Sequence, residues 1–134
     1  MSNRTQLHDL TVYILEHAGP IRTRQLRLLK AVAGMQVVGT GTDAEADLPT
    51  LEALRPDVVL VGLRTGQSLR PVRLLTATLP GSTLIVLSNS GSALMRKACL
   101  GAGGSYCFDK TLEVDELRTA LLEISGAAHR SSEP

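Results

Sequence analysis

Five short apolar runs recur along the chain of 134 residues, and a stretch of helix-like composition follows each one. The runs occupy residues 10–15, 35–40, 57–64, 83–87 and 105–108. The first four contain Val, Ile or Leu, and the short last one contains Tyr and Phe, residue types that favour strands buried in a sheet. The intervening stretches are too long for hairpin turns, so consecutive strands must run parallel, with a helix crossing over between them. The pattern therefore predicts five strands that alternate with five helices.

Right-handed crossovers with one reversal of winding turn this pattern into an α/β, flavodoxin-like (βα)5 fold. We expect a doubly wound, five-stranded parallel sheet with strand order 2-1-3-4-5. Residues 57–64 (DVVLVGLR) are predicted to form its central strand. Ligands of such sheets gather beyond the carboxyl ends of the strands. At that edge the central strand presents Gly62, which offers only backbone.

The strand and helix pattern covers residues 10–126, which we predict to be one domain. Residues 1–9 are polar and are predicted to be a lead-in, and residues 127–134 lack apolar periodicity and are predicted to be a disordered tail. Ser90 or Ser92 is expected to cap the fourth helix, and Thr111 the fifth. No DNA-binding domain is expected.

Composition argues against several classes of function. Lys and Arg number 14 against 13 Asp and Glu, so no global field favours nucleic acid or a membrane surface. No apolar run approaches the roughly 20 residues that span a bilayer, and the start of the chain lacks a signal peptide, so a cytoplasmic location is expected. Cys99 and Cys107 lack CxxC spacing and are predicted to be buried free thiols, with redox sensing as the alternative.

Short motifs at the predicted strand ends carry a family resemblance. They are ILEH after the first strand, RPDVVLVGLR, LPGSTLIVLSN, and GAGGSYCFDKTLEVDEL around the fifth strand. Each motif alone is weak, but their order and spacing are specific. Over about residues 10–125 the chain resembles the CheY-like receiver domain of two-component response regulators.

The resemblance implies a phosphorylatable aspartate after the third strand and two acidic Mg²⁺ ligands after the first. It also implies a hydroxyl after the fourth strand and a lysine after the fifth. Ser88 and Lys110 match the hydroxyl and the lysine, and Glu16 matches the first acidic position. His17 falls on the second acidic position, and Gly62 falls on the phosphoacceptor. The resemblance thus implies a degenerate pseudo-receiver.

The chemistry expected of this site follows from those departures. Phosphoryl transfer needs an oxygen nucleophile and a divalent cation, and Gly62 supplies no nucleophile. A site reduced to Glu16, an imidazole at His17 and backbone oxygen is expected to bind Mg²⁺ weakly or not at all, so we predict no metal, no cofactor and no enzymatic activity. Asp57 lies about 16 Å from the crevice at about 3.3 Å per residue and cannot substitute. Phosphorylation of another residue by a histidine kinase stays open.

Two further roles stay open for the surviving side chains. Lys110 is expected to pair with Glu16 or Asp109; alternatively, Lys110, Ser88 and backbone amides cradle an anion. A hydrolase built on Ser88, His17 and Glu16 is disfavoured because the chain has no nucleophile elbow. The aromatic switch position of the family holds Cys107, beside Tyr106.

These observations predict an atypical receiver that acts in signal transduction by phosphorylation-independent protein–protein interaction. The expected partner is a protein, for example a histidine kinase or another regulator, and a homodimer stays open. The resemblance places the interaction face within residues 91–125, with Met95, Arg96, Tyr106 and Arg118 as candidates. The alternative is a sensor that binds a small anion or nucleotide in the crevice near Gly62, Ser88 and Lys110.

Overall fold

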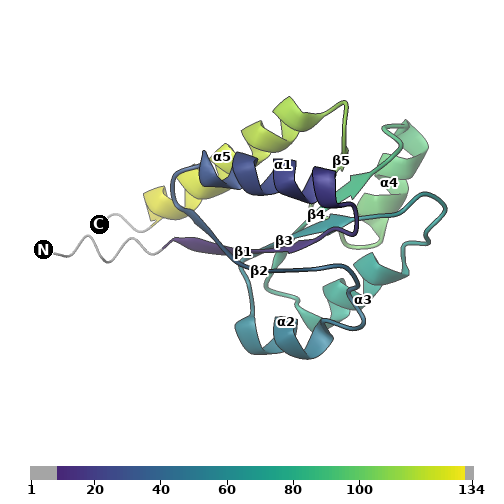
Figure 1. Cartoon of the computed structure of the whole chain (residues 1–134), viewed down its shortest axis with the longest axis horizontal. Coiled ribbons are helices and arrows are strands. Elements are labelled where there is room, and N and C mark those ends of the chain that lie inside the picture. The colour runs from purple at the N-terminus through teal and green to yellow at the C-terminus, as the bar shows by residue number, and fades with distance from the viewer. Residues whose placement is uncertain (1–8, 132–134) are drawn as a thin grey trace, which may run out of the picture.

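A computed structural model describes residues 9–131, in which five strands alternate with five helices (Figure 1). The strands are β1 (Leu10–Leu15), β2 (Met35–Gly41), β3 (Val58–Gly62), β4 (Thr83–Ser88) and β5 (Tyr106–Asp109). The helices are α1 (Gly19–Lys30), α2 (Leu48–Leu54), α3 (Arg70–Thr78), α4 (Ala93–Gly101) and α5 (Val114–Ser131). Every predicted strand is confirmed to within two residues at either end, because each apolar run ends where its strand leaves the core.

The five strands form one parallel sheet in the order β2-β1-β3-β4-β5, which confirms the predicted flavodoxin-like fold. Strand β3 is central, and its first four residues are buried. Leu15 at the end of β1 pairs with Val61 on β3. The next residues on the two strands, Glu16 and Gly62, therefore lie side by side at the carboxyl edge of the sheet.

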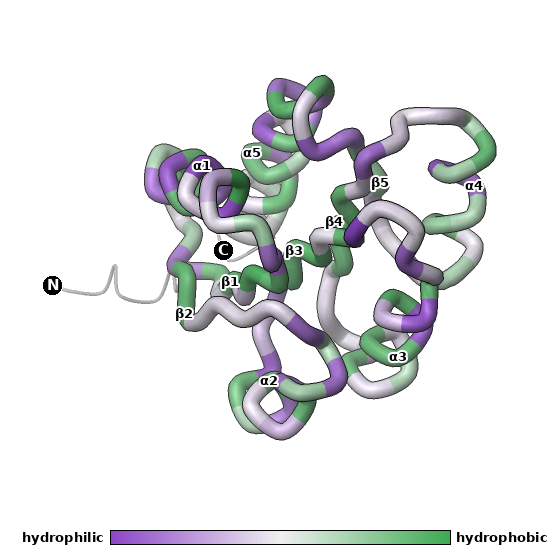
Figure 2. Tube along the Cα trace, turned by 45° about the vertical axis from the view of Figure 1, so that its right-hand side comes forward, coloured by the Kyte–Doolittle hydropathy of each residue, from purple (hydrophilic) through white to green (hydrophobic). Residues whose placement is uncertain are grey.

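Two aliphatic cores cover the sheet, one on each face. Helices α1 and α5 lie over one face, and α2, α3 and α4 lie over the other (Figure 1). Because side chains alternate along a strand, Val59 and Val61 pack toward α2, α3 and α4, and Val58 and Leu60 pack toward α1 and α5. Figure 2 shows the hydrophobic β3 and β4 in the middle of the molecule.

Tyr13 fixes the edge strand β2 to the rest of the sheet. A methyl group built on Gly39 of β2 would lie 2.5 Å from the Tyr13 ring, so only glycine fits beneath it. The Tyr13 hydroxyl donates a hydrogen bond to the Asp47 carboxylate at 2.7 Å. Burial, followed by that hydrogen bond and the Asp47 charge, raises the pKa of Tyr13 to about 12.

Asp57 lies at the amino end of the central strand β3, at the rim of the sheet opposite its carboxyl edge. Its carboxylate accepts a hydrogen bond from the Thr11 backbone N–H at 2.8 Å, and the Thr11 hydroxyl accepts one from the Asp57 N–H at 3.0 Å. Asp57 thus ties β3 to β1 at their amino ends, away from the carboxyl edge.

Within residues 9–131, no helix combines the length and the apolar character needed to cross a bilayer.

Two predicted boundaries of the last helix are wrong. Thr111 does not cap it, because the Asp109 carboxylate accepts the N–H groups of Thr111 and Leu112 in a turn, and α5 begins at Val114. The helix continues to Ser131, so residues 127–131 are helical where a disordered tail was predicted; alanines such as Ala127 favour the helix and nothing there breaks it. The remainder of the predicted tail, 132–134, and residues 1–8 of the predicted lead-in lie outside the described residues. For α4, Ser92 is the cap, accepting the Met95 N–H at 3.1 Å.

Candidate functional site

A fully buried carboxylate lies at the carboxyl edge of the sheet. Glu16, the first residue after β1, has no exposed surface, and its position next to β3 follows from the pairing of the two strands. Its Oε2 atom accepts hydrogen bonds from the Lys110 ammonium at 3.0 Å and the Ala18 N–H at 3.2 Å. Its Oε1 atom accepts one from the Gln25 amide at 3.3 Å. Both carboxylate oxygens of Glu16 therefore accept hydrogen bonds from other groups of the protein.

Glycine at position 62 is what gives Glu16 its space. A Cβ atom built on Gly62 would overlap Glu16 Oε1, would lie 2.8 Å from the Glu16 carboxyl carbon and would lie 3.1 Å from the carbonyl oxygen of Leu15. Real Cβ atoms essentially never approach other atoms that closely. The carboxylate of Glu16 therefore fills the volume beside β3 where a side chain of residue 62 would begin.

Lys110, the first residue after β5, is the partner of that carboxylate. Its side chain is 1% exposed, and its backbone N–H donates to the Ser88 carbonyl at 2.8 Å, which continues the pairing of β5 with β4. The predicted pair of Lys110 with Glu16 is confirmed. Asp109, the other predicted partner, caps the following turn instead. In a buried pair of this kind each charge compensates the other. Removal of either member leaves an uncompensated buried charge, which destabilises the fold.

His17 lies at the rim of the site. Its side chain is 40% exposed, and its Nδ1 atom lies 3.5 Å from Glu16 Oε2. Within the described residues, no group of three or more His, Cys, Asp or Glu side chains is placed to share a metal ion. Mg²⁺ prefers an octahedral shell of oxygen ligands, and the Glu16 carboxylate is already bound to an ammonium while His17 offers nitrogen, so Glu16 and His17 do not fit Mg²⁺.

The predicted crevice holds two adjoining hollows, which share Arg64 and Gln67 in their walls. Gly62 lines a polar one of about 210 Å³ with Arg64, and Ser88 lines an apolar one of about 270 Å³ with Asn89. Lys110 lines neither. The buried Ser88 hydroxyl donates to the Ser90 carbonyl at 2.6 Å. The structure therefore does not bring Gly62, Ser88 and Lys110 together around one open space.

Helix α1 closes over the buried pair with residues that the sequence analysis missed. Gln25 is buried, and one end of its amide donates to Glu16 while its Oε1 atom has no partner within the described residues. Arg22 donates to the backbone carbonyl of Glu16 at 3.2 Å, and Arg24 donates to that of Lys110 at 3.4 Å. The one available signal was the spacing of Gln25, four residues before the buried Leu29 on the same helix face.

The predicted switch position is occupied by a buried thiol. Cys107 and Cys99 are both buried and free, as predicted. Burial, followed by a hydrogen bond with Cys99, raises the pKa of the Cys107 thiol to about 12, so reactive thiolate is scarce. The half-buried Tyr106 ring stacks on Phe108, with ring centroids 6.0 Å apart.

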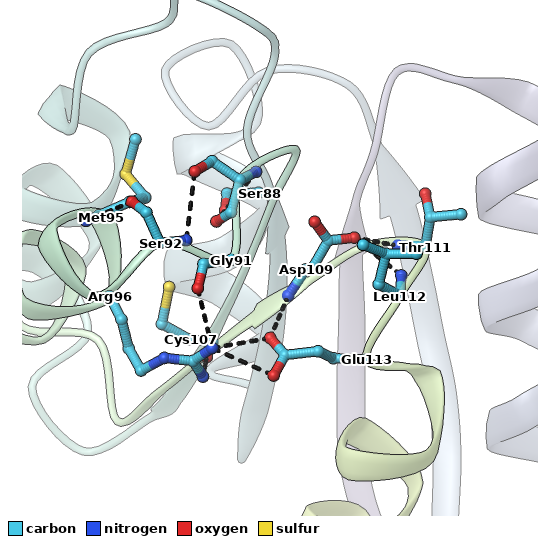
Figure 3. Close-up of polar contacts among 11 residues, drawn as sticks. Ser88, Gly91, Ser92, Met95, Arg96, Cys107, Asp109, Thr111, Leu112 and Glu113 are labelled. Atoms are coloured by element: carbon cyan, nitrogen blue, oxygen red, sulfur yellow. Dashed lines mark hydrogen bonds and ion pairs between the residues drawn. The ribbon is translucent and has the colours of Figure 1, made fainter.

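Arg96 is a structural clamp between α4 and the start of α5 (Figure 3). Its guanidinium donates to the Cys107 carbonyl at 2.6 Å and to the Glu113 carboxylate at 2.9 and 3.1 Å. The same carboxylate accepts the Asp109 N–H at 2.8 Å. Of the four candidate interaction residues, Arg118 is exposed, whereas Met95, Arg96 and Tyr106 are half-buried.

Comparison with known proteins gives matches at the level of structure. No family model matches the sequence, and no curated protein matches it significantly. Among solved structures, the receiver domain of RcsB from Salmonella enterica serovar Typhimurium aligns with a TM-score of 0.79 at 17% identity, covering 95% of this chain and 100% of that one. The signal receiver domain of NarL from Mycobacterium tuberculosis aligns with a TM-score of 0.73 at 18% identity, covering 92% and 98%.

A third match is CheY from Borrelia burgdorferi in its complex with CheX, with a TM-score of 0.78 at 14% identity and coverage of 91% and 93%. These alignments span nearly the whole of each neighbour, and their strands and helices follow the same order as in this chain. At sequence identities below 20%, these alignments show a shared fold. The chemistry of the site is argued from the residues of this chain. The chain has the fold of the response-regulator receiver domain.

Proposed function

We propose that this chain acts in signal transduction as a pseudo-receiver, by protein–protein interaction that does not depend on phosphorylation. The observation that carries the proposal is the Glu16 carboxylate, which fills the volume beside Gly62 and pairs with Lys110. An ordinary receiver changes conformation when a charge is installed at this edge. Here the Glu16 carboxylate already places a negative charge at this edge, and the Lys110 ammonium neutralises it.

The structural neighbours illustrate what the site would have to hold. The CheY complex from Borrelia burgdorferi contains BeF₃ and Mg²⁺, and the RcsB domain was determined in the presence of phosphomimetic BeF₃⁻. In this chain the position of the phosphoacceptor has no side chain, and the lysine that would meet an added anion already meets Glu16. The switch is therefore held in one conformation by sequence, and partners recognise that conformation.

Partner recognition is assigned to the surface of α4, β5 and α5, with a histidine kinase or another regulator as the expected kind of partner. Arg118 is exposed there, and the Arg96 clamp fixes how α4 meets α5. The small-ligand alternative is supported less well, because Lys110 is buried and lines neither hollow, so an incoming anion would find its cation already paired.

Incubation of the purified chain with acetyl phosphate and Mg²⁺, followed by intact mass measurement under conditions that preserve acyl phosphates, tests the proposal. We expect no added phosphoryl group, while an ordinary receiver treated in parallel gains one. A stoichiometric phosphoryl adduct on this chain would overturn the proposal, whichever residue carried it. Fragment analysis would then identify that residue.

A further inference from the structure

The charges of this chain are unevenly distributed, although their sum is close to zero. Residues 58–108, which span β3, α3, β4, α4 and most of β5, contain no Asp or Glu. The same stretch contains five basic residues: Arg64, Arg70, Arg73, Arg96 and Lys97. This part of the molecule therefore supplies positive charge without any acidic residue of its own.

Two of those five cations are neutralised by acids from elsewhere in the chain. Arg70 pairs with Glu45 at 2.9 Å, and Arg96 pairs with Glu113. Arg64, Arg73 and Lys97 are exposed and make no ion pair with any residue in the part of the chain that the structure describes.

An apolar groove is lined by the loops that precede α3 and α4 and by the first turns of α4, and both helices cover the same face of the sheet (Figure 1). It consists of two connected hollows, of about 270 and 330 Å³, which share Gln67, Ser90 and Met95 in their walls. Leu69, Leu94 and Ala98 add apolar surface to the wall of the larger hollow, beside Ser68 and Ser92. The side chain of Leu94 is 80% exposed, so it is accessible to a partner.

The three unpaired cations belong to the loop and the helices that form this groove. Arg64 lines the smaller hollow. Arg73 follows Leu69 by four residues and Lys97 follows Leu94 by three, so each lies one helical turn from a leucine of the wall. The groove thus has an apolar floor and a cationic rim.

We propose that this groove binds an acidic amphipathic segment of a partner protein, with aliphatic side chains seated between α3 and α4. Carboxylates of the segment would meet Arg64, Arg73 and Lys97. The inference rests on the proposed function and specifies its partner. It places the contact on the side of α4 that faces α3, and not on the side of α4 that faces α5. Complementary charge would steer the encounter and fix the register of the bound segment.

Other occupants fit these features less well. No aromatic side chain lines either hollow, so nucleic acid bases would find no stacking surface. A second copy of the chain offers the exposed Leu112 near the acidic Asp115 and Glu116, but Leu112 lies in a turn, and the next exposed leucine of α5, Leu122, is ten residues away. Two connected hollows take more than one aliphatic side chain, which a separate amphipathic helix supplies at successive turns.

Selection of binders from a random peptide library displayed on phage, with the whole chain as the target, tests the proposal. We expect the enriched peptides to be net negative and to carry Leu, Ile or Val at helical spacing. Synthetic versions should bind at least tenfold more weakly to Leu94→Glu, and selection on the double variant Arg73→Glu/Lys97→Glu should enrich peptides of opposite charge. Arg27→Glu/Lys30→Glu, which changes two exposed cations on α1, is the matched control and should leave both results unchanged.

Several results would overturn the inference. One is enrichment of basic or uncharged peptides on the wild-type chain, or of no peptide. Another is binding that Leu94→Glu leaves intact while the α1 control abolishes it. Concentration-dependent self-association that Leu94→Glu and Leu112→Glu each abolish would identify a second copy as the occupant. In all these cases the phosphoryl-uptake measurement decides separately whether the proposed function survives.

Discussion

The Glu16 carboxylate and the Cα atom of Gly62 are neighbours across β1 and β3, at a distance that leaves no room for a side chain at position 62. Glu16 cannot move toward water without leaving Lys110, whose ammonium is also buried. The identity of residue 62 and the position of a carboxylate on a different strand are therefore one structural feature. A substitution at either position acts on both.

Adding one methyl group tests that coupling. Gly62→Ala is expected to reduce the free energy of unfolding by about 1–3 kcal/mol, because the new Cβ atom must displace Glu16. Urea denaturation of the two single variants and the double variant measures the coupling. In the Glu16→Ala background the same glycine substitution should cost much less, whereas an equal cost in both backgrounds would show that the overlap relaxes freely.

Breaking the buried ion pair is expected to be more damaging than replacing it. Lys110→Met leaves Glu16 buried without its cation and should cost about 3–5 kcal/mol of stability by urea denaturation. The double variant Glu16→Gln/Lys110→Met removes both charges and should recover much of that loss. A double variant no more stable than Lys110→Met would show that the Lys110 stem, rather than its charge, is what matters.

Restoring an aspartate at position 62 should not restore phosphorylation. In Gly62→Asp the new carboxylate meets Glu16, and His17 still supplies no oxygen for Mg²⁺. We expect at most trace phosphoryl uptake from acetyl phosphate by intact mass, and more from Gly62→Asp/His17→Asp than from Gly62→Asp. If Gly62→Asp alone were modified as readily as an ordinary receiver, this account of His17 would be wrong.

The clamp between α4 and α5 has a local readout. Glu113→Gln retains an oxygen for the Asp109 N–H but loses the ionic contact with Arg96, and it should cost about 1 kcal/mol. Hydrogen exchange at the backbone amides of β5 should become faster, while exchange in β1 stays unchanged. Equal acceleration in both strands would indicate global destabilisation instead of a local clamp.

Alkaline pH should weaken the fold through Tyr13. Its pKa is raised from 10.0 to about 12, so the neutral phenol is favoured in the folded state. Stability from this group is complete below pH 10 and is lost as the pH rises toward 12. In denaturation series over that range, Tyr13→Phe should decline less steeply than the wild-type chain. Parallel curves for the two proteins would contradict the assigned shift.

The elements of the fold were predictable because their signals are local. The apolar run at residues 57–64 identified the central strand, and Pro20 and Pro71 marked helix starts, where the structure has them in first turns. The end of α5 was mispredicted because alanines carry no apolar periodicity, although they favour a helix. Thr111 was mispredicted as a cap because a turn, in which Asp109 accepts the N–H groups of Thr111 and Leu112, delays the start of α5 to Val114.

The site was predictable in its members and not in its geometry. The pair of Lys110 with Glu16 could be anticipated, because both residues follow strands that end at the same edge of the sheet, where a charged side chain needs a partner or water. That Glu16 fills the space beside Gly62 could not, because it depends on the register of β1 against β3 and on a side-chain rotamer. Gln25 lies in a helix rich in arginines, and its spacing from Leu29 is the one feature of its sequence context that distinguishes it from an exposed residue.

The packing of Glu16 against Gly62 also constrains the paths that mutation can take. An aspartate introduced at position 62 alone is expected to be strained, because it displaces Glu16, and to stay a poor phosphoacceptor. A phosphorylatable site is expected to need changes at positions 62 and 17 together. Positions 62 and 16 are also epistatic, because the residue that either position tolerates depends on the residue at the other.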